Sequence, residues 1–201
     1  MQFVRSFMLN GTSVRTPFMT SRQMQFVRSF DGFQVLKLSY QQGSDTRRFS
    51  MYIYLPDAQD GLPSLTERIC SGLGFIDSHL PSNAVTLDEF RIPRFKIGFK
   101  FEASSVMEKL GVVDVFKRGG LSEMVVENGE ALGVNRILHK AFVEVNEEGT
   151  EAAAVTVGKA LKCARQQKPK LMFVDHPFLF TIREDTSGLL LFVGQMLDLS
   201  S

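Results

Sequence analysis

The sequence predicts a mixed α+β domain in which β-hairpins pack on a second sheet. Three observations support this fold class: apolar residues alternate along several segments, turn residues separate these segments, and the stretches with helical spacing are short. With 44% apolar residues, a chain of this length can bury roughly 70% of its unfolded surface in one compact body. We therefore expect residues 1–201 to form a single domain.

A repeated heptapeptide marks the N-terminal region. Met-Gln-Phe-Val-Arg-Ser-Phe occurs at residues 1–7 and again, unchanged, at residues 24–30. Because the period does not continue, the repeat indicates a local duplication and not a solenoid. We expect the second copy to form a strand and residues 1–9 to form an irregular tail. The Asn-Gly-Thr segment at 10–12 is a glycosylation sequon, but Asn-Gly is also a turn dipeptide, and we expect the turn.

Two strands and two short helices follow. Residues 33–40 and 49–55 alternate apolar and polar side chains on either side of a turn-forming segment, a pattern typical of a hairpin. Residues 62–70 and 74–80 have the apolar spacing of helices, and Ser64 is the expected early cap of the first.

The second half of the chain again favours strands. Residues 85–101 alternate, but Pro93 interrupts the ladder, so two strands joined at this proline are expected. Residues 104–110 begin with a serine cap signal and form a short amphipathic helix. The remaining strands are expected at residues 136–145, 176–183 and 188–197.

Composition and motifs argue against catalysis. The chain has 23 basic and 22 acidic residues, so no net field attracts nucleic acid or an anionic membrane. It contains no nucleophile elbow, Walker loop or HExxH motif, and His176 is expected to be structural, with a backbone partner. Cys70 and Cys163 have no metal or redox spacing. The sequence predicts a protein that is not an enzyme and has no cofactor, no metal site and no disulfide framework.

No segment of the sequence is suited to export or to membrane insertion. The first residues lack the hydrophobic run of a signal peptide, and no stretch approaches the ~20 apolar residues of a membrane span. By sequence, the chain is expected to be cytosolic and to have no membrane partner.

Residues 144–155 have the composition of a conformational hinge, because charged residues run through Gly149 into three consecutive alanines. If residues 149–158 enter a sheet, the period of two places only small residues on one face. Such side chains can slide between two strands without a clash. Local propensity alone instead favours a helix here, capped by Thr150. The small face consists of Thr150, Ala152, Ala154, Thr156 and Gly158.

Three segments together resemble the serpin family. Residues 144–155 resemble the serpin hinge, residues 138–142 resemble the strand that leads into it, and residues 172–182 resemble the family signature. From about residue 10 to residue 199 the chain is similar to the C-terminal half of serpins, and most similar to plant members. Further segments that carry the resemblance are residues 17–20, 31–33, 54–57, 92–95 and 194–198.

This resemblance implies a partial serpin fold with mixed and antiparallel sheets. It would contain the B and C sheets, part of the A sheet, a few short helices and an exposed reactive loop. The hinge and loop would span residues 146–171, and the C-terminal strands residues 172–199. The second heptapeptide copy would lie in the small C sheet. Nothing in the chain resembles the N-terminal half of the family, which supplies the A-sheet strand that lies beside residues 136–145.

The resemblance also implies inhibition of a protease through a cleavable loop. In serpins the protease cleaves the loop, an acyl-enzyme forms, and the loop inserts into the A sheet and distorts the protease. Counting from Gly149 places the reactive bond at Cys163–Ala164, with Lys162 and Arg165 as rivals because a trypsin-like pocket prefers a basic residue. The implied hinge consists of Glu147, Glu148, Gly149, Thr150, Glu151, Ala152, Ala153 and Ala154.

Partners and supporting residues follow from the same resemblance. The target would be a trypsin-like serine protease or a papain-like cysteine protease. Arg94 would pair with Glu147, and His139 would hydrogen-bond neighbouring strands beneath the opening of the sheet. Family members are often extracellular, so the compartment stays open.

An alternative function arises from the missing N-terminal half. Without it, the residual A sheet has an apolar edge that is prone to pairing. The chain would then be a truncated, non-inhibitory fragment that serves as a protease substrate or adds as a strand to another protein, and strand-exchange oligomers would become possible.

Overall fold

The computed structural model describes residues 2–44, 46–124, 132–146 and 170–200. The chain divides into two compact units, Met1–Phe95 with Val145–Ser201 and Lys96–Glu144, and the single domain expected from the sequence stays a prediction. The physical reason for the division is local pairing, since the second unit is built on two strands that pair with each other. The predicted α+β class is confirmed, because the described part of the chain contains three sheets and three short α-helices.

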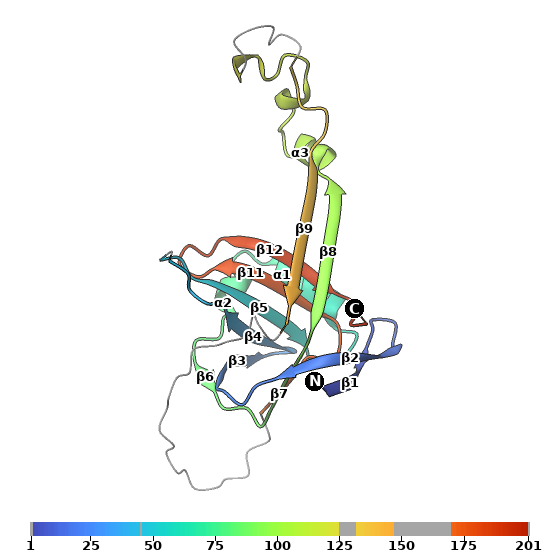
Figure 1. Cartoon of the computed structure of the whole chain (residues 1–201), viewed down its shortest axis with the longest axis vertical. Helices are drawn as coiled ribbons and strands as arrows, with labels where there is room; N and C mark the ends of the chain where they lie inside the picture. The colour runs from blue at the N-terminus through green and yellow to red at the C-terminus, as the bar shows by residue number, and fades with distance from the viewer. Residues whose placement is uncertain (1, 45, 125–131, 147–169, 201) are drawn as a thin grey trace. The chain divides into compact units, whose positions relative to one another are not determined.

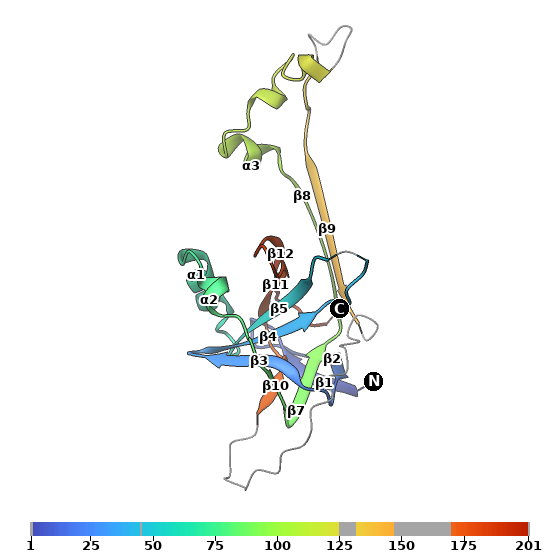
Figure 2. The same cartoon turned by 90° about the vertical axis from the view of Figure 1, so that its left-hand side faces the viewer.

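A four-stranded sheet in the first unit brings together strands from both ends of the chain. Its order is β1-β2-β7-β10, with β1 (Gln2–Phe7), β2 (Ser13–Thr20), β7 (Glu89–Pro93) and β10 (Leu171–Phe173). β1, β2 and β7 pair antiparallel in this order (Figure 1), whereas β10 is parallel to β7 (Figure 2).

The expected irregular tail is instead a paired strand. Residues 2–7 form β1, in register with β2, and the side chain of Ser6 is fully buried. The Asn-Gly turn is confirmed, because Gly11 has φ 79° and the Thr12 amide donates to Asn10 Oδ1 at 2.9 Å. The sequence did not predict β1 because an edge strand forms only by pairing with its neighbour. Here the neighbour is β2, which the turn at Asn10 and Gly11 brings beside residues 2–7.

The second heptapeptide copy forms β3 (Gln25–Phe30) in the six-stranded sheet, so its expected place in the smaller sheet is wrong. In both copies, the arginine lies over the phenylalanine two residues later on the same face of the strand. The guanidinium carbon of Arg5 is 5.4 Å from the centre of the Phe7 ring, and that of Arg28 is 4.8 Å from the Phe30 ring. The contact between arginine and phenylalanine is therefore the same in both copies, although β1 and β3 lie in different sheets.

The six-stranded sheet contains the most buried strand. Its order is β12-β11-β5-β4-β3-β6, and every pair is antiparallel. All residues of β5 except Phe49 are buried, as expected for a central strand that is covered on both faces. The strands not yet given are β4 (Phe33–Ser39), β5 (Phe49–Pro56), β6 (Ala84–Val85), β11 (Phe178–Glu184) and β12 (Leu190–Met196).

Two helices, α1 (Leu62–Ser71) and α2 (Phe75–Ser78), pack on one face of this sheet (Figure 2). Ser64 does not cap α1, since the cap residue is Gly61 and a proline lies in the first turn, where its fixed φ suits a helix start. The shared core consists of Phe33, Val35, Tyr52, Tyr54, Leu62, Leu65 and Leu179.

The second unit is a long β-ribbon with short helical turns at one end. Its strands β8 (Phe95–Glu102) and β9 (Leu138–Val145) form a two-stranded sheet. Ser104 does not cap α3 (Ser104–Lys109), because its hydroxyl accepts a 2.9 Å hydrogen bond from the amide of Ile137. Two 3₁₀ turns follow at Asp114–Phe116 and Ser122–Met124. None of the helices in the described ranges is long and apolar enough to cross a membrane.

Candidate functional site

The segment between β9 and β10 contains the predicted hinge and reactive bond. The structure describes only its ends, Asn146 and residues 170–171. The hinge residues, from Glu147 to Ala154, and the reactive-bond candidates, from Lys162 to Arg165, lie outside the described residues. The site is therefore described by how the chain holds the two ends of this segment.

The C-terminal end of the segment is fastened by hydrogen bonds to β7 and to Asp88, the residue before β7. The Lys170 amide donates to Asp88 Oδ2 at 2.8 Å, and the Asp88 amide donates back to the Lys170 carbonyl at 2.9 Å. Parallel pairing of β10 with β7 follows, and the Val174 amide then donates to the Arg91 carbonyl at 3.0 Å. The chain is held on both sides of β10.

Side-chain burial adds a larger stabilising effect. Met172 and Val174 are fully buried, and the Phe173 ring lies 5.4 Å from the ring of Phe18. Burying an aliphatic side chain of this size contributes about 1.5–3 kcal/mol. The anchor at β10 thus depends mainly on the alternate residues that face the core.

Arg91 provides the polar part of the anchor. Its Nε lies 2.6 Å from Glu89 Oε1, and its guanidinium carbon lies 5.7 Å from the centre of the Phe173 ring. Both charged side chains are partly exposed, and such pairs contribute only about 0–1 kcal/mol. The ion pair joins two residues of β7, and burial therefore contributes more than charge to holding β10.

The N-terminal end of the segment leaves β9, whose side chains are much more exposed. Lys96 Nζ lies 3.6 Å from Glu144 Oε2 and 5.0 Å from the centre of the Phe142 ring, which is 51% exposed. His139 is also exposed, with its ring 5.4 Å from that of Phe101. In the described part of the chain β9 pairs only with β8, so the role implied for His139 stays a prediction.

Arg94 lies between β7 and β8 and is half-buried. Its amide donates to the Pro17 carbonyl at 2.9 Å, which fixes the backbone where the chain leaves the four-stranded sheet. Its predicted partner, Glu147, lies outside the described residues, so the ion pair stays a prediction.

The signature segment at 172–182 continues from β10 into β11 through His176. This side chain is buried, with Nε2 donating to the Pro56 carbonyl at 2.7 Å and Nδ1 at 2.8 Å from Asp175 Oδ1. The predicted structural role, with a backbone partner, is confirmed. The bonds join the start of β11 to the end of β5.

A cluster of side chains around one carboxylate, that of Asp185, lies just after β11 and was not expected from the sequence. Asp185 accepts hydrogen bonds of 2.8 Å from each of Lys37 Nζ, Ser50 Oγ and Tyr52 OH. Burial opposes ionisation of Asp185, but these three hydrogen bonds outweigh it and hold its pKa below the ordinary value. Burial, together with the bond to Asp185, raises the pKa of Tyr52. Asp185 links three strands.

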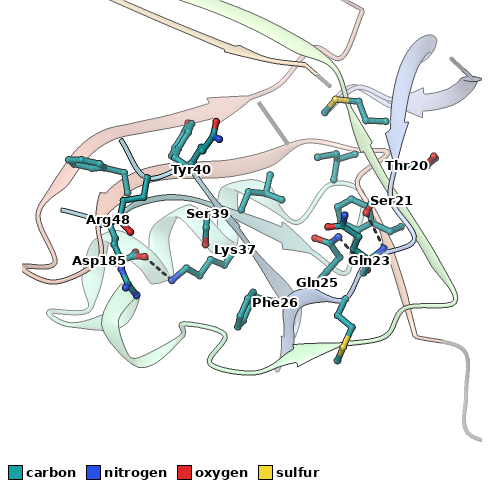
Figure 3. Close-up of a pocket in the computed structure, with 18 residues that line it drawn as sticks. Thr20, Ser21, Gln23, Gln25, Phe26, Lys37, Ser39, Tyr40, Arg48 and Asp185 are labelled. Carbon is teal, nitrogen blue, oxygen red and sulfur yellow. Dashed lines mark hydrogen bonds and ion pairs between the residues drawn. The ribbon is translucent and has the colours of Figure 1, made fainter. Parts of the chain in front are cut away.

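An open cavity of about 870 Å³ lies beside this cluster, as Figure 3 shows. Phe26, Tyr40 and Arg48 contribute to its wall, together with the ion pair between Lys37 and Asp185. Burial raises the pKa of Tyr40 and favours its neutral phenol. Because Lys37 and Asp185 neutralise each other, this part of the wall adds no net charge that would select an ionic ligand.

No set of three or more His, Cys, Asp and Glu side chains that could hold a metal occurs among the described residues. Sequence reasoning did not find Asp88 or Asp185 as anchoring residues. Asp88 lies within the predicted strand that begins at residue 85 and carries a weak signal, whereas Asp185 meets Lys37 across 148 positions of sequence, a distance over which no local pattern extends.

Comparison with known proteins gives a consistent result. The family model "Serpin (serine protease inhibitor)" matches residues 2–199. Serpin-Z10 of Arabidopsis thaliana is 50% identical over 194 residues, which are 95% of this chain and 50% of that protein. Serpin-ZXA of Oryza sativa subsp. japonica is 49% identical over 95% of this chain and 48% of its own length.

Solved structures agree with the sequence comparison. The structure of Arabidopsis AtSerpin1 in its native stressed conformation superimposes with a TM-score of 0.78 and 43% identity, covering 98% of this chain and 51% of that one. This chain thus spans about half the length of the curated relatives that it matches.

Proposed function

Because the chain belongs to the serpin family, we propose that it is a serine-type endopeptidase inhibitor that offers residues 146–171 as a cleavable reactive loop. The observation that carries the proposal is the anchor at β10. Parallel pairing with β7 and full burial of Met172 and Val174 support a strand that stays in the sheet after the loop is cut. A protease can then separate the two ends of the loop without unfolding the body.

The target is a trypsin-like serine protease or a papain-like cysteine protease. The reactive bond is Cys163–Ala164, and Lys162 and Arg165 are the rival positions. A buried acid in the pocket of a trypsin-like enzyme would select one of the two basic side chains, whereas a papain-like enzyme would not require a base.

Trapping depends on a competition between two steps. The protease hydroxyl or thiol attacks the carbonyl carbon of the reactive bond, the C–N bond breaks, and an acyl-enzyme remains while the new amino terminus departs. The small face of the hinge then enters a sheet before water hydrolyses the ester or thioester. In this proposal Arg94 pairs with Glu147 near the hinge, and His139 hydrogen-bonds the strands that open.

A second function is favoured by one observation in the second unit. Among the described strands, β9 pairs only with β8. No described strand lies on the other side of β9, so the loop has no gap between β9 and a second neighbour to enter. The alternative is a non-inhibitory fragment that proteases cleave as a substrate, or that adds as a strand to another protein.

One experiment separates the two functions. The purified chain is incubated with trypsin and, separately, with papain, and the products are analysed by denaturing gel and mass spectrometry. A covalent adduct that survives denaturation, with cleavage between Lys162 and Arg165, is the result expected of an inhibitor. Cleavage at the same place without an adduct would identify a substrate and overturn the inhibitor function.

A further inference from the structure

Just after β10 the chain passes from one sheet to the other. The Val174 amide donates to the Arg91 carbonyl of β7 at 3.0 Å, and the Asp175 carbonyl accepts a 2.7 Å hydrogen bond from the amide of Phe7, the last residue of β1. Both bonds lead to strands of the four-stranded sheet. β11 of the six-stranded sheet begins three residues after Asp175. Residues 176–177 therefore form the joint between the two sheets.

The main chain alone cannot close this joint. β5 and β11 are neighbours (Figure 1), and continuing their antiparallel register back by two positions places Pro177 opposite Pro56. The Asp57 amide donates to the Gly32 carbonyl on the β4 side at 2.9 Å, so the preceding Pro56 carbonyl faces the β11 side. Proline has no amide proton, so Pro177 cannot donate the ladder bond that this carbonyl would accept. The buried Pro56 therefore needs another donor for its carbonyl.

The side chain of His176 supplies the missing donor. Its Nε2 donates to the Pro56 carbonyl at 2.7 Å, and His176 is only 7% exposed. Its Nδ1 lies 2.8 Å from Asp175 Oδ1, and this contact fixes the orientation of the ring. The bond to Pro56 is buried inside the first unit. It therefore does not depend on what covers the exposed surfaces of the chain.

We propose that His176 is a positioning residue that keeps the C-terminal end of the reactive loop in place, through its hydrogen bond to the Pro56 carbonyl. β10 is only three residues long, so it can open together with the residues that follow it. An opening that spreads as far as the joint must break the bond between His176 and Pro56. The bond thus limits how much of the chain detaches when the loop is strained. The inference rests on the proposed function only in taking residues 146–171 as the reactive loop.

Hydrogen exchange of single amides tests this role. His176→Asn removes the donor to Pro56, and the opening that exposes the Val174 amide then breaks one hydrogen bond fewer. This amide should exchange about tenfold faster, the factor that corresponds to ~1.4 kcal/mol. The matched control is Tyr52→Phe, which removes a hydrogen bond to Asp185 elsewhere in the first unit and should leave Val174 within about twofold of the parent. An unchanged Val174 amide in His176→Asn, or equal acceleration by both variants, would overturn the proposal.

Two further variants separate the donor from the shape of the ring. The amide nitrogen of His176→Gln can occupy the position of Nε2, so this variant should restore Val174 exchange to within about threefold of the parent. Asp175→Ala, at a partly exposed position, removes only the carboxylate that orients the ring and should accelerate Val174 exchange about threefold. Far-UV circular dichroism confirms that each variant is folded.

The glutamine variant gives the decisive result. If His176→Gln exchanges as fast as His176→Asn, packing of the ring holds the joint and the proposed role of the donor is wrong. If His176→Asn does not fold, Asp175→Ala decides, and Val174 exchange at the parent rate in that variant would equally contradict the proposal. None of these measurements involves a protease, so their failure is distinguishable from a failure of the proposed inhibitory function.

Discussion

The two ends of the loop segment differ in how completely their apolar side chains are covered. At the C-terminal end, β10 buries Met172 completely, and hydrogen bonds to Asp88 and Arg91 fasten the backbone. At the N-terminal end, Leu138 and Phe142 on one face of β9 are each 51% exposed, while Val143 and Val145 on the other face are buried. The difference lies in the neighbouring strands: β10 joins a four-stranded sheet, whereas β9 has one described partner. An apolar strand becomes an anchor only where other elements cover it.

The largest expected effect compares matched truncations at the two ends. Met172→Ala should lower the free energy of unfolding by about 2–5 kcal/mol, because it removes fully buried atoms and leaves a cavity. Phe142→Ala should cost less than about 1 kcal/mol, because half of the ring is already in water. Urea titrations of both variants measure the difference. Equal losses would show that β9 is as well covered as β10.

The hinge variants test whether the N-terminal end moves into a sheet. Ala152→Arg places a large charge on the small face and should reduce the protease adduct about fivefold or more relative to cleaved product, since overpacking costs about 1–3 kcal/mol. Ala153→Arg lies on the opposite face and is the control, with adduct yield close to the parent. The yields are read from denaturing gels. An Ala152→Arg chain that forms as much adduct as the parent would argue against insertion.

Asp185 tests the polar part of the well-packed first unit. Its pKa is lowered from 3.8 by three hydrogen bonds that outweigh burial. A depressed carboxyl pKa stabilises the fold above the unfolded-state value, and this stabilisation is lost as the pH falls through the folded-state value. The parent chain should therefore lose stability below about pH 4, and Asp185→Asn should reduce this loss by about 1 kcal/mol. Unfolding midpoints at pH 6 and pH 3 measure it. A loss that is the same in both proteins would exclude Asp185 as its source.

The smallest effect concerns the backbone fastening of β10. Asp88→Ala removes the acceptor of the Lys170 amide and should cost about 0.5–1.5 kcal/mol in the free energy of unfolding. Asp88→Asn retains a side-chain oxygen and should cost less. Hydrogen exchange of the Lys170 amide separates the variants, and exchange that is unchanged in Asp88→Ala would show that burial alone holds the strand.

Much of the fold was predictable because local patterns decide it. The strands at 33–40 and 49–55 were expected from alternation and are β4 and β5, and the break at Pro93 divides β7 from β8 as predicted. The partial serpin fold is confirmed by the family match and by the AtSerpin1 structure. These features depend on periodicity and on residues with restricted backbones, which a sequence displays directly.

The features that were missed depend on distant partners. Ser64 and Ser104 have the composition of caps, but a proline defines the start of α1, and the hydroxyl of Ser104 is used by the distant amide of Ile137. The bond between Asp185 and Lys37 joins elements that no local window contains. The predicted hinge and reactive bond lie outside the described residues and remain predictions.

The duplicated heptapeptide gives the folding chain a choice between identical strands. For β4, closing a two-residue turn to the adjacent copy is favoured over closing about 25 residues to the first copy by about 2 kcal/mol of loop entropy. For β2 the two copies are almost equally near in sequence, so chain length does not distinguish them. The left-handed Gly11 and the Asn10 side chain, which shape the turn between β1 and β2, then decide which copy pairs with it. Correct sheet assignment of two identical segments thus depends on one short turn.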